Sequence, residues 1–455
     1  MRSIWAVARN TIRQALRMKI AAAFVLLLLV LVPVMGLAVS GDNTIKGGLQ
    51  SFVTYSLAIV SLLLSLLTVI VAAYSLADDI KQCRIYTVLT KPIRRYELLL
   101  GKVLGVILLD LVLLVFFSSA IYWITRYIPV HKKADAQQME VLDKEFFTAR
   151  ASVKPPQPDV TKEVIELYEK LKENNQLPEG ATFREIIKYL TQIKKIEKQA
   201  AGPGQELRWE FDNIRITDPN QSLFLRFKYD VAINPPDLNI YGTWIAGDLR
   251  QLPMVPTGRG SIYTFDRKDL IRTFHELEIP GNAVASDGHL EIAFFNDPGF
   301  NATVVIFGPE DGLELLYKAE SYTANFVKAV LIIFFRLVFL ACLGIFAASF
   351  LSFPVAILLC LAVLFMAATG GFALESFNFL SNEINTAYKY TVELLIQMIP
   401  RFDEHTPSDY LVPARLISWS LLAKIAAVVV GLQSLVVLLL SLLIFRFKEI
   451  AKITV

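Results

Sequence analysis

The sequence predicts a polytopic α-helical membrane protein with six transmembrane helices, an N-terminal interfacial helix and an extracytoplasmic α+β domain containing a jelly-roll-like β-sandwich. Of its 455 residues, 54% are hydrophobic and only 19% are charged, against about 25% charged in soluble domains. Six nearly uncharged stretches hold this excess, and each is long enough to cross a ~30 Å hydrocarbon core as a helix. The long polar segment between the third and fourth stretches alternates apolar and polar residues, which is typical of strands.

The composition excludes a soluble enzyme, a nucleic-acid-binding protein and a disordered chain. The first stretch is longer than the apolar core of a signal peptide and a second stretch soon follows, so we expect a retained helix, with a removed signal as the alternative. The fourth and fifth stretches are separated by only a few residues, which predicts a tight helical hairpin. The six stretches are residues 20–39, 52–76, 103–125, 329–350, 354–374 and 425–445.

The distribution of Lys and Arg predicts the orientation. Basic residues gather before the first stretch, between the second and third, and after the sixth, whereas the connection after the first has only Lys46. Because short cytosolic loops are enriched in positive charge, both termini are expected in the cytosol. The segment 129–325, with 23 basic and 30 acidic residues, is then extracytoplasmic. We expect a multi-pass protein of the plasma (inner) membrane.

Residues 1–128 comprise the interfacial helix and transmembrane helices 1 to 3. On a helical wheel Arg2, Arg9, Arg13 and Arg17 fall within an arc of about 80°, and the opposite half is apolar. Such a helix lies in the membrane interface with its cations toward anionic headgroups. The alternative is a cytosolic stub that merely follows the charge rule.

Residues 129–325 form the predicted extracytoplasmic domain. Apolar residues at helical spacing and a capping box predict a helical pair over 159–199. The period then changes to two, and about eight short runs separated by turn residues predict a β-sandwich of jelly-roll type over 205–320. Four aromatic residues suit either a sugar-binding platform or, as we favour, the sandwich core. They are Trp209, Tyr241, Trp244 and Tyr263.

Residues 326–455 hold transmembrane helices 4 to 6. An external helical loop, residues 375–418, is expected between the last two helices. Within it residues 388–399 are strongly apolar but too few to cross a membrane. We therefore expect an amphipathic or partly re-entrant helix there.

Known catalytic and metal-binding motifs are missing from the sequence. It has no P-loop, no G-x-S-x-G turn, and no spacing of its four histidines that suits a metal. We therefore expect a non-catalytic membrane subunit without catalytic, cofactor-binding or metal-ligating residues.

Two charged residues lie within the predicted spans. Asp110 is the eighth residue of the third span and Arg336 the eighth of the fourth. Each is about 10 Å from its own face of the membrane, so their depths differ by about 10 Å. Intramembrane charges often mark a transport pathway. The alternative is local satisfaction by another helix or by snorkelling.

The segment 77–102 is the most informative part of the chain. It leaves the second span with Asp78 and Asp79, continues as a short amphipathic helix through Leu89, breaks at Pro92 and restarts into the third span. A short, charged cytosolic helix of this kind suits docking to a soluble partner. The alternative is a plain basic loop.

This segment resembles the cytosolic coupling helix of type-2 ABC exporter permeases. That family has an acidic residue, a basic residue, an "LL-x-x-P-[IV]-x-R" pattern and a "GK" that enters the third span; its acid is usually Glu, and here it is Asp. The resemblance covers residues 1–128 and 329–455, and the large domain between them departs from the minimal family pattern. The matching residues proposed for ATPase docking are Asp78, Asp79, Arg84, Leu89, Lys91, Pro92, Arg94 and Arg95.

The resemblance implies a permease subunit in a homodimer or heterodimer, bound to two ABC ATP-binding subunits. ATP and Mg²⁺ would be bound by those subunits, with no cofactor on this chain and no nucleic acid as partner. One alternative is mechanotransmission, in which ATP hydrolysis drives the extracytoplasmic domain without transport. Another is an ATPase-independent membrane protein that displays a carbohydrate-binding-like sandwich.

Overall fold

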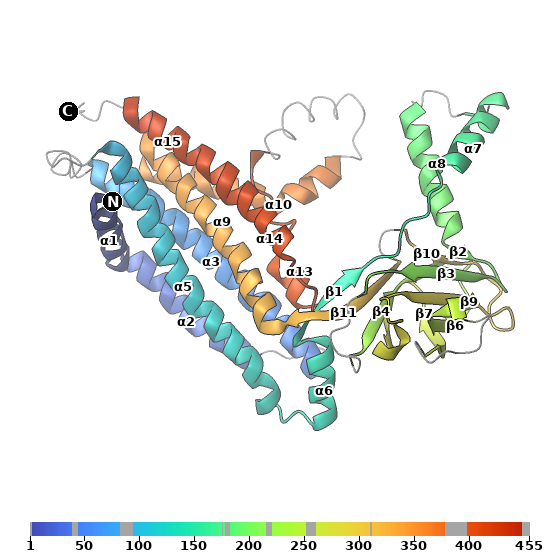
Figure 1. Cartoon of the computed structure of the whole chain (residues 1–455). Helices are drawn as coiled ribbons and strands as arrows, with labels where there is room; N and C mark the ends of the chain where they lie inside the picture. The colour runs from blue at the N-terminus through green and yellow to red at the C-terminus, as the bar shows by residue number, and fades with distance from the viewer. Residues whose placement is uncertain are drawn as a thin grey trace. The chain divides into compact units, whose positions relative to one another are not determined.

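The computed structural model describes residues 2–38, 44–81, 94–174, 176–177, 183–214, 221–251, 261–309, 312–377 and 398–447. The chain divides into two compact units (Figure 1). The first combines Met1–Ala149 with Glu320–Val455 and is helical, and the second is Arg150–Ala319.

Within the described residues, six helices of the first unit are long and apolar enough to cross a membrane, which confirms the prediction of six such elements. The last of them is continuous from α14 through the π-helical segment η4 into α15. The helices of this unit are α1 (Arg2–Leu16), α2 (Lys19–Ala38), α3 (Ile45–Lys81), α5 (Arg95–His131), α6 (Ala136–Glu145), α9 (Tyr322–Phe350), α10 (Phe353–Phe377), α13 (Pro407–Leu411), α14 (Trp419–Ile425), η4 (Ala426–Ser434) and α15 (Leu435–Phe447).

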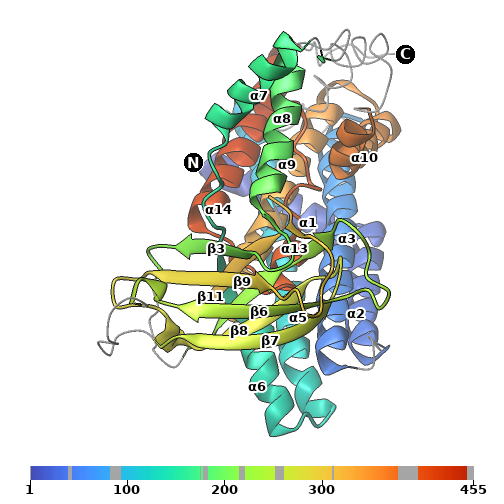
Figure 2. The same cartoon turned by 90° about the vertical axis from the view of Figure 1, so that its right-hand side faces the viewer.

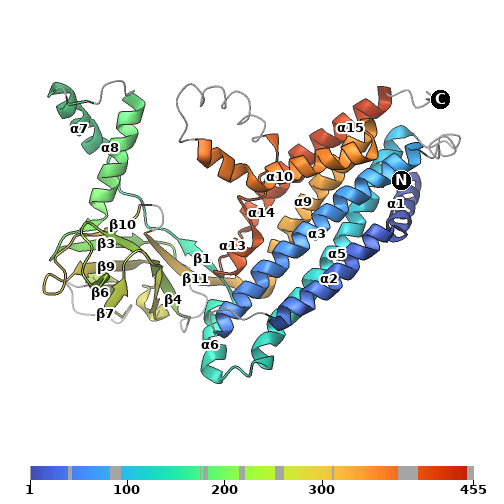
Figure 3. The same ribbon diagram turned by 180° about the vertical axis from the view of Figure 1, so that it is seen from behind.

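Helices α3, α5 and α9 pack against one another and form the core of this unit, and α2 lies against α3 and α5 (Figure 3). More than half of the spanning residues of these three helices are buried, but fewer than a quarter are in α2, α10 and the last span. The leucines exposed on those outer helices are compatible with contact to lipid tails, because apolar surface is not unfavourable in an apolar solvent. Small residues bring the core helices together: a Cβ on Gly344 of α9 would lie 2.6 Å from that of Ala72 on α3.

The described strands of the second unit form three sheets, with orders β1-β11-β4-β8, β2-β10-β5 and β3-β9-β6-β7. Figure 2 shows the strands of the last of these sheets side by side. Apolar side chains from all three sheets meet in one core, in which Trp209 and Trp244 are buried as the core-packing interpretation expected. The strands are β1 (Thr148–Val153), β2 (Ala200–Ala201), β3 (Glu206–Phe211), β4 (Leu223–Phe227), β5 (Tyr229–Val231), β6 (Asn239–Gly247), β7 (Tyr263–Leu270), β8 (His275–Ile279), β9 (Leu290–Asn296), β10 (Val305–Phe307) and β11 (Leu313–Ser321).

Two helices of the second unit lie where the sequence predicts a helical pair. They are α7 (Thr161–Glu173) and α8 (Phe183–Lys198), which pack on each other. Helix α6, strand β1 and the π-helical turn η4 were not expected from the sequence. Positions 378–397, which include most of the predicted apolar loop helix, lie outside the described residues.

Candidate functional site

The two flanks of the coupling-like segment lie at the end of α3 and the start of α5. Asp78 and Asp79 belong to the last turn of α3, and Arg94 and Arg95 precede or begin α5. The predicted docking residues Arg84, Leu89, Lys91 and Pro92 lie outside the described residues.

A buried ion pair joins these flanks. The Nζ atom of Lys102, on the second turn of α5, is 2.5 Å from Oδ2 of Asp79 and also donates to the carbonyl oxygen of Ser75 on α3. The Lys102 side chain is only 2% exposed and that of Asp79 12%. Because a buried charge is tolerated only when it is paired, this contact fixes the end of α3 to the start of α5.

Helix α1 packs directly on the start of α5. The contact is made through Gly101 and Gly105, one turn apart, where an added Cβ would lie 2.6 Å from the Cβ of Val7 and 2.7 Å from the carbonyl oxygen of Ala8. Close approach of two helices through a G-x-x-x-G pair is common in membranes. The predicted amphipathic helix therefore has a third face, of small residues. Ala8, Thr11 and Ala15 are buried on it.

Asp78 and the basic face of α1 meet beside this contact. The side-chain amide of Gln14 donates to Oδ2 of Asp78 at 3.2 Å. A cleft of about 600 Å³ opens here between α1, the start of α2, α3 and the start of α10. Its lining includes Arg13, Arg17, Lys19, Tyr74, Asp78 and Phe353.

Arg95 makes a contact that the sequence did not predict. Its Nη1 atom donates to the carbonyl oxygens of Phe445 at 3.1 Å and Arg446 at 2.9 Å, in the last turn of α15. A cation at a helix C-terminus satisfies orphan carbonyls and favours the helix dipole. Arg94 instead stands at the N-cap of α5, where its backbone N–H donates to the Glu97 carboxylate. The start of α5 is thus attached to α1, α3 and α15.

Arg336 of α9 is satisfied within the helical unit. Its Nη2 donates to the carbonyl oxygens of Phe402 and His405, and its guanidinium lies 5.3 Å from the Phe402 ring centroid. A cavity of about 290 Å³ adjoins it. Both carbonyls belong to the segment before α13 and not to another helix, as the alternative of local satisfaction had supposed. The polar residues that line the cavity are Ser61, Ser65, Arg336, Asp403, Thr406 and Ser408.

Asp110 of α5 lies apart from Arg336, and no ion pair joins the two. Its side chain is 1% exposed, and the hydroxyl of Thr68 on α3 is the described group that interacts with its carboxyl. That hydroxyl itself donates to the carbonyl oxygen of Leu64. Buried carboxyls are usually hydrogen-bonded more fully than this.

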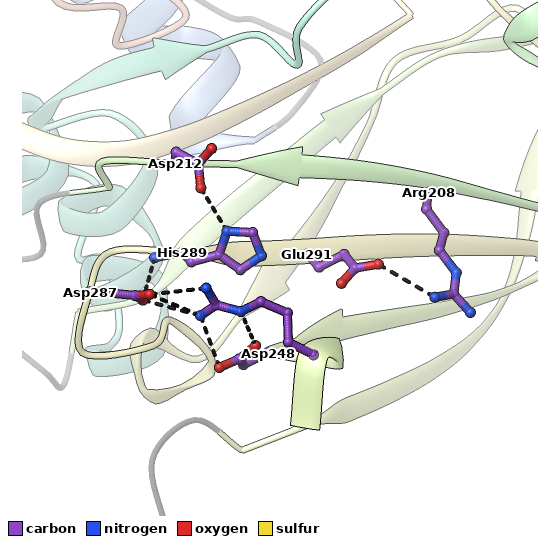
Figure 4. Close-up of polar contacts among 7 residues, drawn as sticks. Arg208, Asp212, Asp248, Asp287, His289 and Glu291 are labelled. Carbon is purple, nitrogen blue, oxygen red and sulfur yellow. Dashed lines mark hydrogen bonds and ion pairs between the residues drawn. The ribbon is translucent and has the colours of Figure 1, made fainter. Parts of the chain in front are cut away.

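The second unit holds a polar cluster at one end of the strands of the sheet β3-β9-β6-β7 (Figure 4). Nδ1 of His289 lies 2.7 Å from Oδ1 of Asp212, and Arg250 bridges Asp248 and Asp287 at 2.8 and 3.0 Å. The hydrogen bonds from Arg250 hold the pKa of Asp287 below its ordinary value. These pairs join the end of β3, the end of β6 and the turn before β9, so the cluster holds these strand ends together.

No described group of three or more His, Cys, Asp or Glu residues is placed to hold a metal ion. Comparison of the chain with protein-family models, curated proteins and solved structures found no match. The functional interpretation therefore depends on the residues of this chain and on the geometry at the flanks of the coupling-like segment.

Proposed function

We propose that this chain is the transmembrane permease subunit of an ABC exporter, which moves an unidentified substrate with ATP hydrolysed by a separate ATPase subunit. The observation that carries the proposal is the attachment of the start of α5 to three other helices. The Lys102–Asp79 pair joins it to α3, the Gly101 and Gly105 contact joins it to α1, and Arg95 joins it to α15. A segment that an ATPase displaces must transmit the displacement to several helices at once.

In this proposal the segment between Asp79 and Arg94 docks on the ATPase, and closure of two ATPases on ATP moves α3 and α5 together. The buried ion pair stabilises these two helices as one body. Two copies of this chain, or this chain and a second permease, would form the path, and the ATPases would supply ATP and Mg²⁺ binding. The jelly-roll-like domain would receive, gate or hand over cargo outside the cell.

A second candidate is mechanotransmission without transport. Strand β11 passes directly into α9, with no linker between Ser321 and Tyr322, and Ser321 caps the helix by accepting a hydrogen bond from the N–H of Ala324. Because α9 belongs to the core of the helical unit, movement there could reach the second unit through a strand. A continuous polar path through a membrane dimer would favour export instead.

The chain purified from its own membranes in mild detergent should retain a P-loop ATPase, and the complex should hydrolyse ATP. The third alternative, an ATPase-independent protein that displays a carbohydrate-binding-like sandwich, predicts a chain without such a partner. Mass spectrometry of the purified complex and a phosphate-release assay separate the two. A chain that is intact, folded and free of any ATPase would contradict the proposal.

The proposed topology, with both termini in the cytosol, has its own test. A cysteine in place of Lys170, which is exposed on α7, should react with a membrane-impermeant maleimide in intact cells, whereas the native Cys83 should react only after lysis. Cys342 and Cys360 are buried and should not interfere. Labelling of Cys83 but not of position 170 in intact cells would reverse the topology.

A further inference from the structure

Helix α8 is amphipathic, and only part of its apolar face has a role in the fold. Ile186 and Leu190 are buried against Val160 and Val164, at the start of α7, in a small core separate from the main core of the unit. The helical pair is therefore held together by its own apolar contacts.

One edge of the apolar face is uncovered. Tyr189, Ile193 and Ile196 follow one another on successive turns of α8 and are 64%, 38% and 39% exposed. Phe183, on the first turn, lies on the opposite edge of this face and packs edge-on against the Tyr168 ring of α7, with 5.0 Å between ring centroids. A row of large apolar side chains on a helix that already has a core marks an interaction surface. We call Tyr189, Ile193 and Ile196 the α8 row.

The charge of α8 is opposite to that of its unit. The helix has five Lys and Arg and two Glu, whereas residues 199–319 have ten Lys and Arg and seventeen Asp and Glu. Three of the lysines have partners. Lys198 pairs with Glu163 of α7 and Lys195 donates to Gln157, before α7, both at 2.6 Å, and Lys194 pairs with Glu197 of α8 at 2.7 Å.

Two further cations of α8 face solvent. Arg184 and Lys188 are exposed and lie about 110–150° around the helix from the centre of the α8 row, with Gln192 and Glu185 between. A helix with a basic polar face and an aromatic and aliphatic apolar face is typical of segments that lie in a lipid interface. Tyrosine in particular favours the headgroup level of a bilayer.

We propose that α8 docks on the surface of the lipid bilayer. In this arrangement the α8 row enters the headgroup region, and Arg184 and Lys188 contact anionic headgroups. The second unit is joined at both ends, Arg150 and Ala319, to a unit with six helices that can cross a membrane. Because both units belong to one chain, α8 meets the bilayer at a high effective concentration, and a weak contact suffices. The proposal does not depend on an ATPase.

The test uses the full chain in nanodiscs of phosphatidylcholine with one quarter phosphatidylglycerol. Cys83, Cys342 and Cys360 are replaced by alanine, and an apolar fluorophore is attached at Ile193→Cys. The matched control carries it at Glu166→Cys, an exposed position on the polar side of α7. A headgroup-nitroxide lipid should quench the label at 193 about threefold more strongly than the label at 166. Equal quenching at both positions would overturn the proposal.

Quenching by soluble iodide and two pairs of substitutions show whether lipid, water or protein surrounds the α8 row. A label at 193 that iodide reaches freely is in water, and one shielded from both iodide and nitroxide lipid is covered by protein; either result overturns lipid docking. Tyr189→Ser with Ile196→Ser should abolish the excess quenching. Arg184→Glu with Lys188→Glu should lower the equilibrium constant for docking of α8 on the anionic nanodisc about fivefold per charge, which is measured as a loss of the excess quenching. Unchanged quenching in both pairs would contradict the assigned surface.

Discussion

Replacing Lys102 by methionine should destabilise the helical unit by about 3–5 kcal/mol, since it leaves the Asp79 carboxylate buried without its cation. In detergent, thermal unfolding should begin about 10 °C lower than in the parent chain. The effect should also reach the coupling-like segment, because the same pair fixes the end of α3 to the start of α5.

The double variant Lys102→Met with Asp79→Leu is the control, because it removes both charges and retains the bulk. Replacement of a whole buried ion pair by apolar residues is often neutral or stabilising. The double variant should therefore recover most of the lost stability. If the single variant unfolds at the parent temperature, the pair does not hold the two helices together.

Replacing Gly105 by leucine should displace α1 from α5. The nearest atoms to an added Cβ are the carbonyl oxygen of Ala8, at 2.7 Å, the Cβ of Thr11, at 2.8 Å, and the Cα of Ala8, at 3.1 Å. Two of these atoms belong to the backbone and the Thr11 Cβ is bonded directly to it, so none can move aside alone. The cost should therefore reach or exceed the ~1–3 kcal/mol of ordinary overpacking. The measurement is limited trypsin cleavage at Arg9 and Arg13, which should become faster when α1 leaves its site.

Gly431→Leu supplies the matched control. An added Cβ there has only the carbonyl oxygen of Ala426 nearby, at 3.9 Å, so the substitution is tolerated sterically. Cleavage of α1 should be unchanged in this variant. Equal cleavage rates in the Gly105→Leu and parent chains would contradict the packing of α1 on α5.

The six long helices could be predicted because membrane crossing imposes a minimum length and an apolar composition, both of which are local properties of the sequence. The period-two runs of the second unit are local in the same sense, and most lie on observed strands. Strand β1 was missed because its sequence, Thr-Ala-Arg-Ala-Ser-Val, has no alternation of large apolar residues and because the helical pair separates it from the other strands. The π-helical turn η4 was missed because its residues are compatible with an α-helix.

The contacts at the candidate site could not be predicted because they join distant parts of the chain. Asp79 and Lys102 are separated by the predicted docking segment, and Arg95 reaches carbonyls more than three hundred residues away. The Gly101 and Gly105 pair was a usable signal, since G-x-x-x-G in an apolar helix predicts close helix packing. Its partner helix, however, is not encoded in that pattern.

The intramembrane charges illustrate the same limit. The sequence predicts that Asp110 and Arg336 lie at different depths in the membrane, and the structure has no ion pair between them. The partners of Arg336 are backbone carbonyls, which have no signature in a sequence. Asp110 is buried beside the hydroxyl of Thr68 on α3, a neighbour that the sequence did not predict.

The central claim is that the segment between α3 and α5 binds an ATPase. Its most direct test is the affinity of that ATPase for the Arg84→Glu, Lys91→Glu variant, measured after maleimide labelling has confirmed normal insertion. Loss of a partly desolvated pair costs about 2–5 kcal/mol, against about 0–1 kcal/mol for an exposed one.

We expect the dissociation constant to rise about thirtyfold or more in this variant. The matched reversal Lys162→Glu, Lys172→Glu, at exposed positions of α7 in the second unit, should leave it unchanged. If the Arg84, Lys91 variant inserts normally and binds the ATPase as tightly as the parent chain, the segment is not the docking element and the account is wrong.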